Sequence, residues 1–439
     1  DPSRCSRSLV PASPRARELL DRAAKLDAAT RAGRAPSVMP LVPALVADAR
    51  ALDDPRTTSA VLLAAGAASR ELGDLETARA NMAEAVIAAG KAGDDDRLIE
   101  ALGAEAAVTT ESGRPVDGLG LLDAADAVAA RRGGGDDPHI AMLRGNALLE
   151  AGKLADAEHV LEHAVKLYEP SAGDPARELD LAAALDLLGV AYYEGNELDK
   201  SRPLELRALA IKERVLGPMH PNVAATLGDL GLLEGKANHL DAAEAYVERT
   251  RVIFTAAYGA DDARVAQTFV TRGYLVARRG KREEGAALTE QGRKLLAKTV
   301  PPDDLAFVSI EQQLGAMAGC PAGIPHFERA AAILEQRKTV AETHGVILGQ
   351  LALCYADAGK LEEAYGPATR SVAELERAGA VPSQLALPWM TLADLEARRG
   401  NRARAIAIAE HFLATTTDEN DTMASMRGHE KAQLAVWKR

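Results

Sequence analysis

The chain has 439 residues and a formal net charge of −12, and it is 47% hydrophobic but 3% aromatic. The acidic balance argues against nonspecific nucleic-acid binding, and the sequence has no run of about eighteen apolar residues that could span a membrane. Alanine and leucine carry most of the apolar content, which favours closely packed helices over strands. We therefore expect an all-α protein that binds no nucleic acid and inserts no part of this chain into a membrane.

Eight small residues recur along the chain: Ala78, Gly118, Ala157, Ser201, Ala243, Gly285, Ala364 and Ala405. The successive gaps are 40, 39, 44, 42, 42, 79 and 41 residues, and the gap of 79 spans two periods with one degenerate copy between them. A glycine or asparagine lies five residues before each: Gly73, Gly113, Gly152, Asn196, Asn238, Gly280, Gly359 and Gly400. Such a period is typical of a stacked helical solenoid. The pattern predicts about ten antiparallel helix hairpins with a period of 39–44 residues.

The small residues have a physical reason. Each lies near the start of the second helix of a hairpin, where it faces the first helix, and only Ala, Gly or Ser lets the two backbones approach. In chain order we expect an irregular lead-in at 1–15, N-terminal repeats at 16–131, central repeats at 132–300, C-terminal repeats including the degenerate copy at 301–415, and a capping helix at 416–439. Solenoids need caps because their end faces would otherwise be exposed.

These residues resemble the tetratricopeptide repeat. Its consensus has glycine at position eight, tyrosine at eleven, and small residues at twenty and twenty-seven, and Gly189, Tyr192, Ser201 and Ala208 match all four. The resemblance covers about residues 30–415 and implies a right-handed superhelical solenoid. The 42-residue form of the repeat, with the stretch at 201–227, is similar to the kinesin-light-chain type of repeat. The whole layout also resembles the C-terminal repeat region of bacterial serine/threonine kinases, although the chain has no kinase motifs.

In this family the first helices of successive hairpins line a concave groove. Alignment to the consensus places repeat positions two, five, nine, twelve and thirteen on that surface. The resemblance therefore implies a partner-binding groove formed by His139, Met142, Asn146, Glu150, Asp186, Val190, Tyr193, Glu194, Gln267, Tyr274, Arg278, Leu353, Asp357, Met390, Asp394 and Arg398. This mixed lining, apolar with scattered charge, suits an extended peptide or an amphipathic helix.

The residues that could carry chemistry are few. His159 and His163 are four apart on a helix and could share a metal, but no HExxH pattern accompanies them, and we interpret both as exposed polar positions. Cys5, Cys320 and Cys354 are too sparse for a disulfide framework or a zinc site. A Cys320–Cys354 bridge is compatible with neighbouring repeats, yet we favour free thiols. We expect no catalytic residues, no metal and no cofactor.

The sequence thus predicts a non-catalytic scaffold that binds a protein or peptide partner in its concave groove. The alternative is a sensory or regulatory region of a bacterial serine/threonine kinase or another signalling protein. Self-association is a further arrangement that the sequence leaves open. We expect a cytoplasmic location, or an extracytoplasmic one if an upstream membrane segment is joined to the chain.

Overall fold

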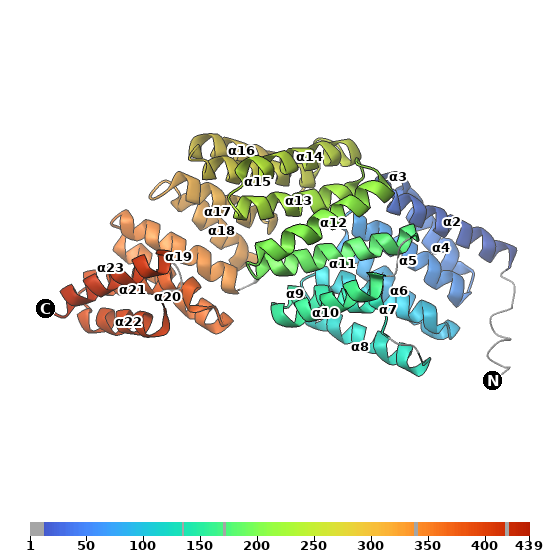
Figure 1. Cartoon of the computed structure of the whole chain (residues 1–439), viewed down its shortest axis with the longest axis horizontal. Helices are drawn as coiled ribbons and strands as arrows, with labels where there is room; N and C mark the ends of the chain where they lie inside the picture. The colour runs from blue at the N-terminus through green and yellow to red at the C-terminus, as the bar shows by residue number, and fades with distance from the viewer. Residues whose placement is uncertain (1–12, 134–135, 170–172, 338–340, 418–420) are drawn as a thin grey trace. The chain divides into compact units, whose positions relative to one another are not determined.

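The computed structural model describes residues 13–133, 136–169, 173–337, 341–417 and 421–439, and within these ranges every regular element is a helix (Figure 1). The all-α prediction is confirmed. Residues 1–12 of the predicted lead-in, with Cys5, lie outside the described ranges. The chain divides into two compact units, Asp1–Ala260 and Asp261–Arg439, which are described separately. No helix of the described part is long and apolar enough to cross a membrane.

The first unit begins with an irregular pair of helices and continues with five regular hairpins in its described part. Its helices are α2 (Pro14–Arg31), α3 (Ala35–Val38), the 3₁₀ helix η2 (Met39–Leu41), α4 (Val42–Ala51), α5 (Pro55–Glu71), α6 (Leu75–Ala92), α7 (Asp95–Glu111), α8 (Pro115–Arg131), α9 (Pro138–Glu150), α10 (Leu154–Tyr168), α11 (Pro175–Glu194), α12 (Leu198–Leu216), α13 (Pro221–Lys236) and α14 (Leu240–Tyr258).

The second unit continues the pairing with four hairpins and a last helix in its described part. Its helices are α15 (Ala263–Arg278), α16 (Arg282–Leu296), α17 (Ala306–Ala318), α18 (Ile324–Arg337), α19 (Ala341–Asp357), α20 (Leu361–Ala378), α21 (Pro382–Arg398), α22 (Arg402–Thr415) and α23 (Asp421–Trp437). Counting the irregular pair α2 and α4, the described helices form ten pairs. The predicted hairpin solenoid is therefore confirmed.

The turn residues have the backbone conformation that ends a helix tightly. All eight glycines and asparagines that precede the small residues have positive φ, from 62° at Asn196 to 86° at Gly280. In the first of these turns the amide of Gly73 donates to the carbonyl of Arg70. Glycine adopts this left-handed conformation without steric cost, and asparagine tolerates it better than most residues do.

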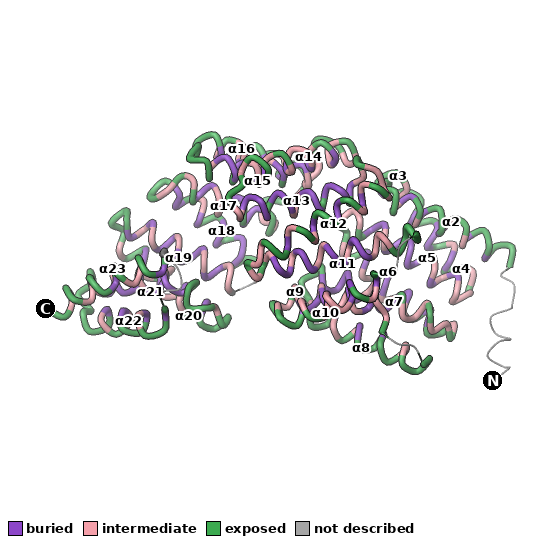
Figure 2. The backbone as a smooth tube through the Cα atoms, viewed as in Figure 1, coloured by how far each residue is buried: buried purple, intermediate pink, exposed green. Residues whose placement is uncertain are grey.

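All eight small residues are buried, and the contacts of Gly118, Ser201 and Gly285 show the first helix of their own hairpin against them. Ser201 donates from Oγ to the carbonyl of Gly189, twelve residues earlier, at 2.7 Å. A Cβ added to Gly285 would lie 2.5 Å from the carbonyl oxygen of Gly273, also twelve residues earlier. The predicted reason for small residues at these positions, the close approach of two helix backbones, is confirmed. Buried residues accordingly follow the facing sides of the helices (Figure 2).

The gap of 79 residues also contains a small residue at the start of a second helix. Gly323 lies just before α18, and a Cβ added to it would meet the carbonyl oxygen of Gly315 at 2.4 Å. This contact joins residues eight apart instead of twelve, so the seventh regular hairpin turns four residues earlier than its neighbours do. The copy is therefore shortened at its turn but keeps the same backbone approach.

Cys320 lies in this shortened turn and forms a disulfide with Cys354 of α19. The preference for free thiols at these two positions is therefore wrong. The early turn brings Cys320 next to the first helix of the following hairpin, with the two Cα atoms 4.8 Å apart, which is within the range that a disulfide spans. Cys354 is buried, as predicted.

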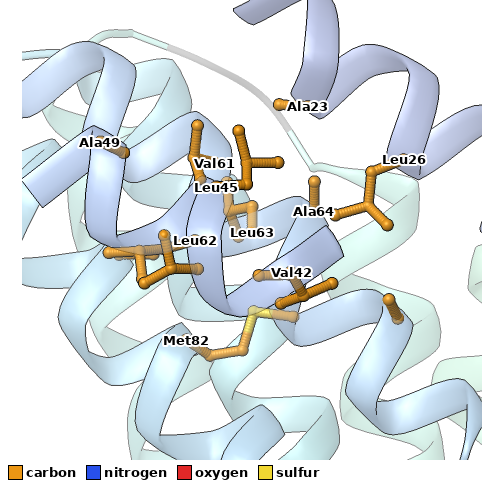
Figure 3. Packing of buried hydrophobic residues seen from close by; sticks show 14 of the residues in the cluster. Ala23, Leu26, Val42, Leu45, Ala49, Val61, Leu62, Leu63, Ala64 and Met82 are labelled. Carbon is orange, nitrogen blue, oxygen red and sulfur yellow. The ribbon is translucent and has the colours of Figure 1, made fainter. Parts of the chain in front are cut away.

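The hydrophobic core runs between successive helices instead of gathering at one centre. At the start of the first unit, Leu26 of α2, Leu45 of α4, Val61 and Leu62 of α5, and Met82 of α6 belong to one cluster (Figure 3). Similar clusters follow along each unit. Each repeat is thus stabilised mainly by its neighbours, as expected for a solenoid.

Candidate partner-binding surface

The first unit contains a hollow of about 400 Å³ that is lined almost entirely by first helices of the hairpins. Its walls come from α2, α5, α7 and α9, and Met82 of α6 also lines it. Much of the lining is alanine, and small side chains leave the space open. A hollow of this size lies within the range of sites that bind small ligands or single segments of a partner.

The lining follows the repeat register. Gly66 occupies position eight of its repeat, so positions two, five and nine are Ala60, Leu63 and Ala67, and all three line the hollow. The same three positions line it in the next repeat, at Glu100, Gly103 and Ala107. Of the sixteen predicted groove residues, His139 lines this hollow. The other walls were not predicted, because the predicted groove residues begin at His139 and the walls lie in earlier repeats.

The charged side chains at the hollow form ion pairs. The three pairs are Arg31 with Asp27 at 2.9 Å, Arg70 with Glu111 at 2.8–2.9 Å, and Arg97 with Glu100 at 2.8 Å. The first and third pairs lie within one helix, whereas Arg70 and Glu111 join the first helices of neighbouring hairpins. The surface is therefore an apolar floor edged by paired charges of both signs.

The predicted groove residues of α9 differ in exposure. Met142 is 7% exposed and packs in the core formed with α10 and α11, so it is a core residue and not part of an open groove. Asn146 is half-buried and Glu150 is exposed. Position five of this repeat faces the next hairpin, and a long apolar side chain there gains more from burial than from exposure to water.

Asp186 of α11 belongs to a polar cluster between two repeats. Lys212 of α12 donates to Asp186 and to Oγ1 of Thr226 in α13 (2.8 Å), and Thr226 donates to Asp186 at 3.1 Å. Glu205 of α12, 1% exposed, is hydrogen-bonded to Asp186. Asp229 of α13 adds a third carboxyl whose charge acts on Asp186 and Lys212. This predicted groove residue is therefore engaged in packing between repeats.

Burial, together with the charges of Asp186 and Asp229, raises the pKa of Glu205 to about 10. Burial also raises the pKa of Asp229 to about 7. Glu205 is therefore a neutral carboxylic acid at neutral pH and can donate its proton to Asp186. Its Oε2 is buried without a hydrogen-bond partner among the described residues, which costs much less for a neutral carboxyl than for a carboxylate.

Further along α11, the predicted residues lie closer to the surface. Glu194 is exposed, and Val190 and Tyr193 are half-buried. Lys236 of α13 donates to the carbonyl of Tyr193 at 2.7 Å and lies 4.3 Å from the centre of its ring. This cation–π contact orders the ring and leaves part of it exposed.

In the second unit the predicted residues lie on α15, α19 and α21. Gln267, Tyr274, Arg278, Asp357 and Arg398 are exposed, whereas Leu353, Met390 and Asp394 are half-buried. The Arg278 guanidinium lies 5.9 Å from the centre of the Tyr274 ring, and Arg398 is paired with Asp394 at 2.8 Å. These side chains are accessible on their own helices, and their role in binding remains a prediction.

The first unit also has contacts between repeats that are far apart in sequence, here called the seam. His220, in the turn before α13, lies with Nε2 3.0 Å from the carbonyl oxygen of Arg31 at the end of α2. Gly33 packs against the ring of Pro221. Tyr258 of α14 donates to Glu71 of α5 at 2.7 Å. The first repeats of this unit therefore contact its last ones.

No group of three or more His, Cys, Asp or Glu side chains suited to a metal occurs among the described residues. His163 of the histidine pair contacts Asp136 at 2.9 Å, and His159 is exposed.

The fold and this surface define an α-helical repeat protein whose first helices form the candidate binding face. Residues 180–256 match the family model described as tetratricopeptide repeat, so this segment consists of tetratricopeptide repeats, as predicted. No curated protein matches the sequence.

Solved structures are similar to the chain at low sequence identity, and two of them, with TM-scores of 0.50 and 0.52, share its fold. The apo form of the quorum sensor NprR from B. thuringiensis is 13% identical, with 82% of this chain and 99% of that chain covered and a TM-score of 0.52. A Rap protein complexed with Competence and Sporulation Factor is 11% identical, with 77% and 97% covered and a TM-score of 0.50. BtubC (BKLC) from P. vanneervenii is 21% identical, with 51% and 91% covered and a TM-score of 0.42.

Proposed function

We propose that the chain is a non-catalytic scaffold that binds a peptide segment of a partner on its first-helix face, with the hollow of the first unit as the main site. The observation that carries this proposal is an open, mainly apolar floor that is rich in alanine and is lined from the same repeat positions in successive hairpins. A regular row of small side chains accepts the larger side chains of an extended peptide, and the charged pairs at its edge orient polar groups.

Two further features support the proposal. The Rap protein of similar fold has been solved with a Competence and Sporulation Factor bound, so this type of solenoid accommodates a ligand. In the second unit, the exposed Tyr274 and Arg278 of α15 form a second candidate contact surface. Partly exposed aromatic and arginine side chains are enriched among residues that dominate binding energy.

The test begins with peptides selected on the full-length chain from a random phage-displayed library, with their affinity measured by fluorescence anisotropy. The double variant Ala24→Leu/Ala60→Leu enlarges two side chains that line the hollow, one on α2 and one on α5. We expect the affinity to fall at least tenfold, because the added atoms occupy the space of the peptide's side chains.

Ala44→Leu is the matched control, since Ala44 is an exposed alanine of α4 outside the hollow. It should leave affinity unchanged. If no peptide is selected, or if the double variant binds as the wild type does, the hollow is not the site. A loss of binding with Tyr274→Ala instead would move the site to the second unit.

A further inference from the structure

The seam of the first unit is not a product of repeat packing. In a solenoid each repeat contacts its neighbours, and stability is close to a sum of neighbour terms. Arg31 and His220 are 189 residues apart, and Glu71 and Tyr258 are 187 apart. Contacts at these separations close the first unit on itself, and they need residues that a regular repeat does not supply.

The residues of the seam fit it specifically. Nδ1 of His220 accepts from the amide of Asn222 at 3.1 Å, so Nε2 carries the proton and donates to the Arg31 carbonyl. Gly33 has φ of +70°, and a Cβ there would meet Cγ and Cδ of Pro221 at 2.9 Å. Glycine is required at this position both for the backbone conformation and for the close contact.

The seam is directly connected to the hollow. Arg31 lines the hollow, and its carbonyl accepts the seam hydrogen bond. Arg70 lines the hollow, and the next residue, Glu71, accepts from Tyr258. Asp180 of α11 interacts electrostatically with Arg31 and with His139, so the two sides of the hollow also influence each other by charge.

The seam is also loosely packed. A second hollow, of about 480 Å³, runs along it between Ala32–Arg34, Leu216–Pro221 and the end of α14. Met219 in this region is 53% exposed. The contacts of the seam named here, two hydrogen bonds and one glycine contact, lie beside an open space and outside the hydrophobic clusters of the hairpins. The seam can therefore separate without disrupting those clusters.

We propose that the seam is a latch whose closure and the occupancy of the hollow are thermodynamically linked, a proposal that rests on the function proposed above. A partner that contacts Arg31 or Arg70 positions the two chain segments that form the seam, so it binds the closed form more tightly than the open one. Linkage is reciprocal: a variant that opens the seam weakens binding by the factor by which the partner favours closure.

The first experiment needs no ligand. Hydrogen–deuterium exchange of the full-length chain is compared between wild type and Gly33→Ala. Residues 217–222, about 190 positions from the substitution, should exchange at least tenfold faster in the variant. Gly152→Ala is the control, because Gly152 has nearly the same φ of +71° but no atom within 4 Å of an added Cβ. It introduces the same backbone strain and should leave 217–222 unchanged.

The second experiment uses the peptide selected against the hollow. It should slow exchange at 217–222 in the wild type, and Gly33→Ala should weaken its affinity about tenfold while Gly152→Ala does not. Tyr258→Phe removes one seam hydrogen bond with little risk to folding. It should also speed exchange at 217–222 and weaken peptide affinity, each by a smaller factor than Gly33→Ala does.

The outcomes separate the two proposals. Unchanged exchange at 217–222 in both Gly33→Ala and Tyr258→Phe overturns the latch. Faster exchange with unchanged peptide affinity shows a seam that opens independently of the hollow, which overturns the linkage and leaves the binding function standing. If no peptide is selected, the binding function fails, and the linkage with it, while exchange still reports whether the seam exists.

Discussion

Replacing Glu205 with glutamine is expected to stabilise the protein at alkaline pH and to have little effect near pH 5. Glutamine has the shape and donor capacity of the protonated carboxyl that the buried cluster contains. The wild-type side chain must keep its proton while folded, because burial and the nearby Asp186 and Asp229 raise its pKa to about 10 from the ordinary 4.5.

The sign follows from proton linkage. Between about pH 4.5 and 10 the folded chain holds a proton on Glu205 that the unfolded chain releases. The free energy of unfolding therefore falls as pH rises through this window, by up to about 1.4 kcal/mol per pH unit. Glu205→Gln removes this contribution, so the variant's advantage grows with pH. Asp229, with its pKa near 7, adds a slope of the same sign that ends near neutrality.

Thermal unfolding by calorimetry between pH 5 and 9 measures the difference between the two proteins. Glu205→Ala is the companion variant: it leaves space beside Gly189 and removes a partner of Asp186, so it should be less stable than Glu205→Gln by about 2–4 kcal/mol at every pH. Parallel pH curves for wild type and Glu205→Gln would show that Glu205 is ionised in the folded protein and that the assignment is incorrect.

Gly285→Ala is expected to destabilise the second unit by about 1–3 kcal/mol, although alanine is the residue that most repeats have at this position. An added Cβ would lie 2.5 Å from the carbonyl oxygen of Gly273 and 2.9 Å from the amide nitrogen of Ala277. Both contacts are with backbone, which no side-chain rotation relieves. The α15–α16 pair has therefore approached more closely than a methyl group permits.

Gly120→Ala is the opposite case. Gly120 is an exposed glycine inside α8, with no atom within 4 Å of an added Cβ, so alanine should stabilise by about 0.5–1 kcal/mol. Urea unfolding of both variants, with hydrogen exchange to locate the change in α15 and α16, tests the pair. Equal effects of the two substitutions would contradict the close approach at Gly285.

The sequence predicted the features that repeat. The period, the glycine or asparagine turn residues and the buried small residues follow from local rules that eight copies obey, so eight observations supported one another. The register even extends to Ala60 and Leu63 in the hollow, where it had not been applied.

Features that occur once were not predictable in the same way. Gly323 makes the expected backbone approach, but its spacing of eight residues hides it from a search at constant offset. The Cys320–Cys354 bond depends on the same early turn. Asp186 fits a groove position, yet its environment depends on Lys212 and Glu205, which the period does not encode. The contact of Gly33 with Pro221 joins distant copies, and a nearest-neighbour pattern contains no information about it.

The disulfide in the shortened hairpin has a consequence for how the second unit unfolds. Solenoids fray from their ends one repeat at a time, since each repeat relies on the next. A bond between Cys320 and Cys354 ties two successive hairpins across 34 residues, a constraint worth about 4 kcal/mol in the chain-entropy picture. Unfolding that starts at α23 would then stop at the disulfide-linked hairpins under oxidising conditions. Under reducing conditions it would continue into the helices that precede them. The length of the ordered solenoid would thus depend on the redox state of its surroundings.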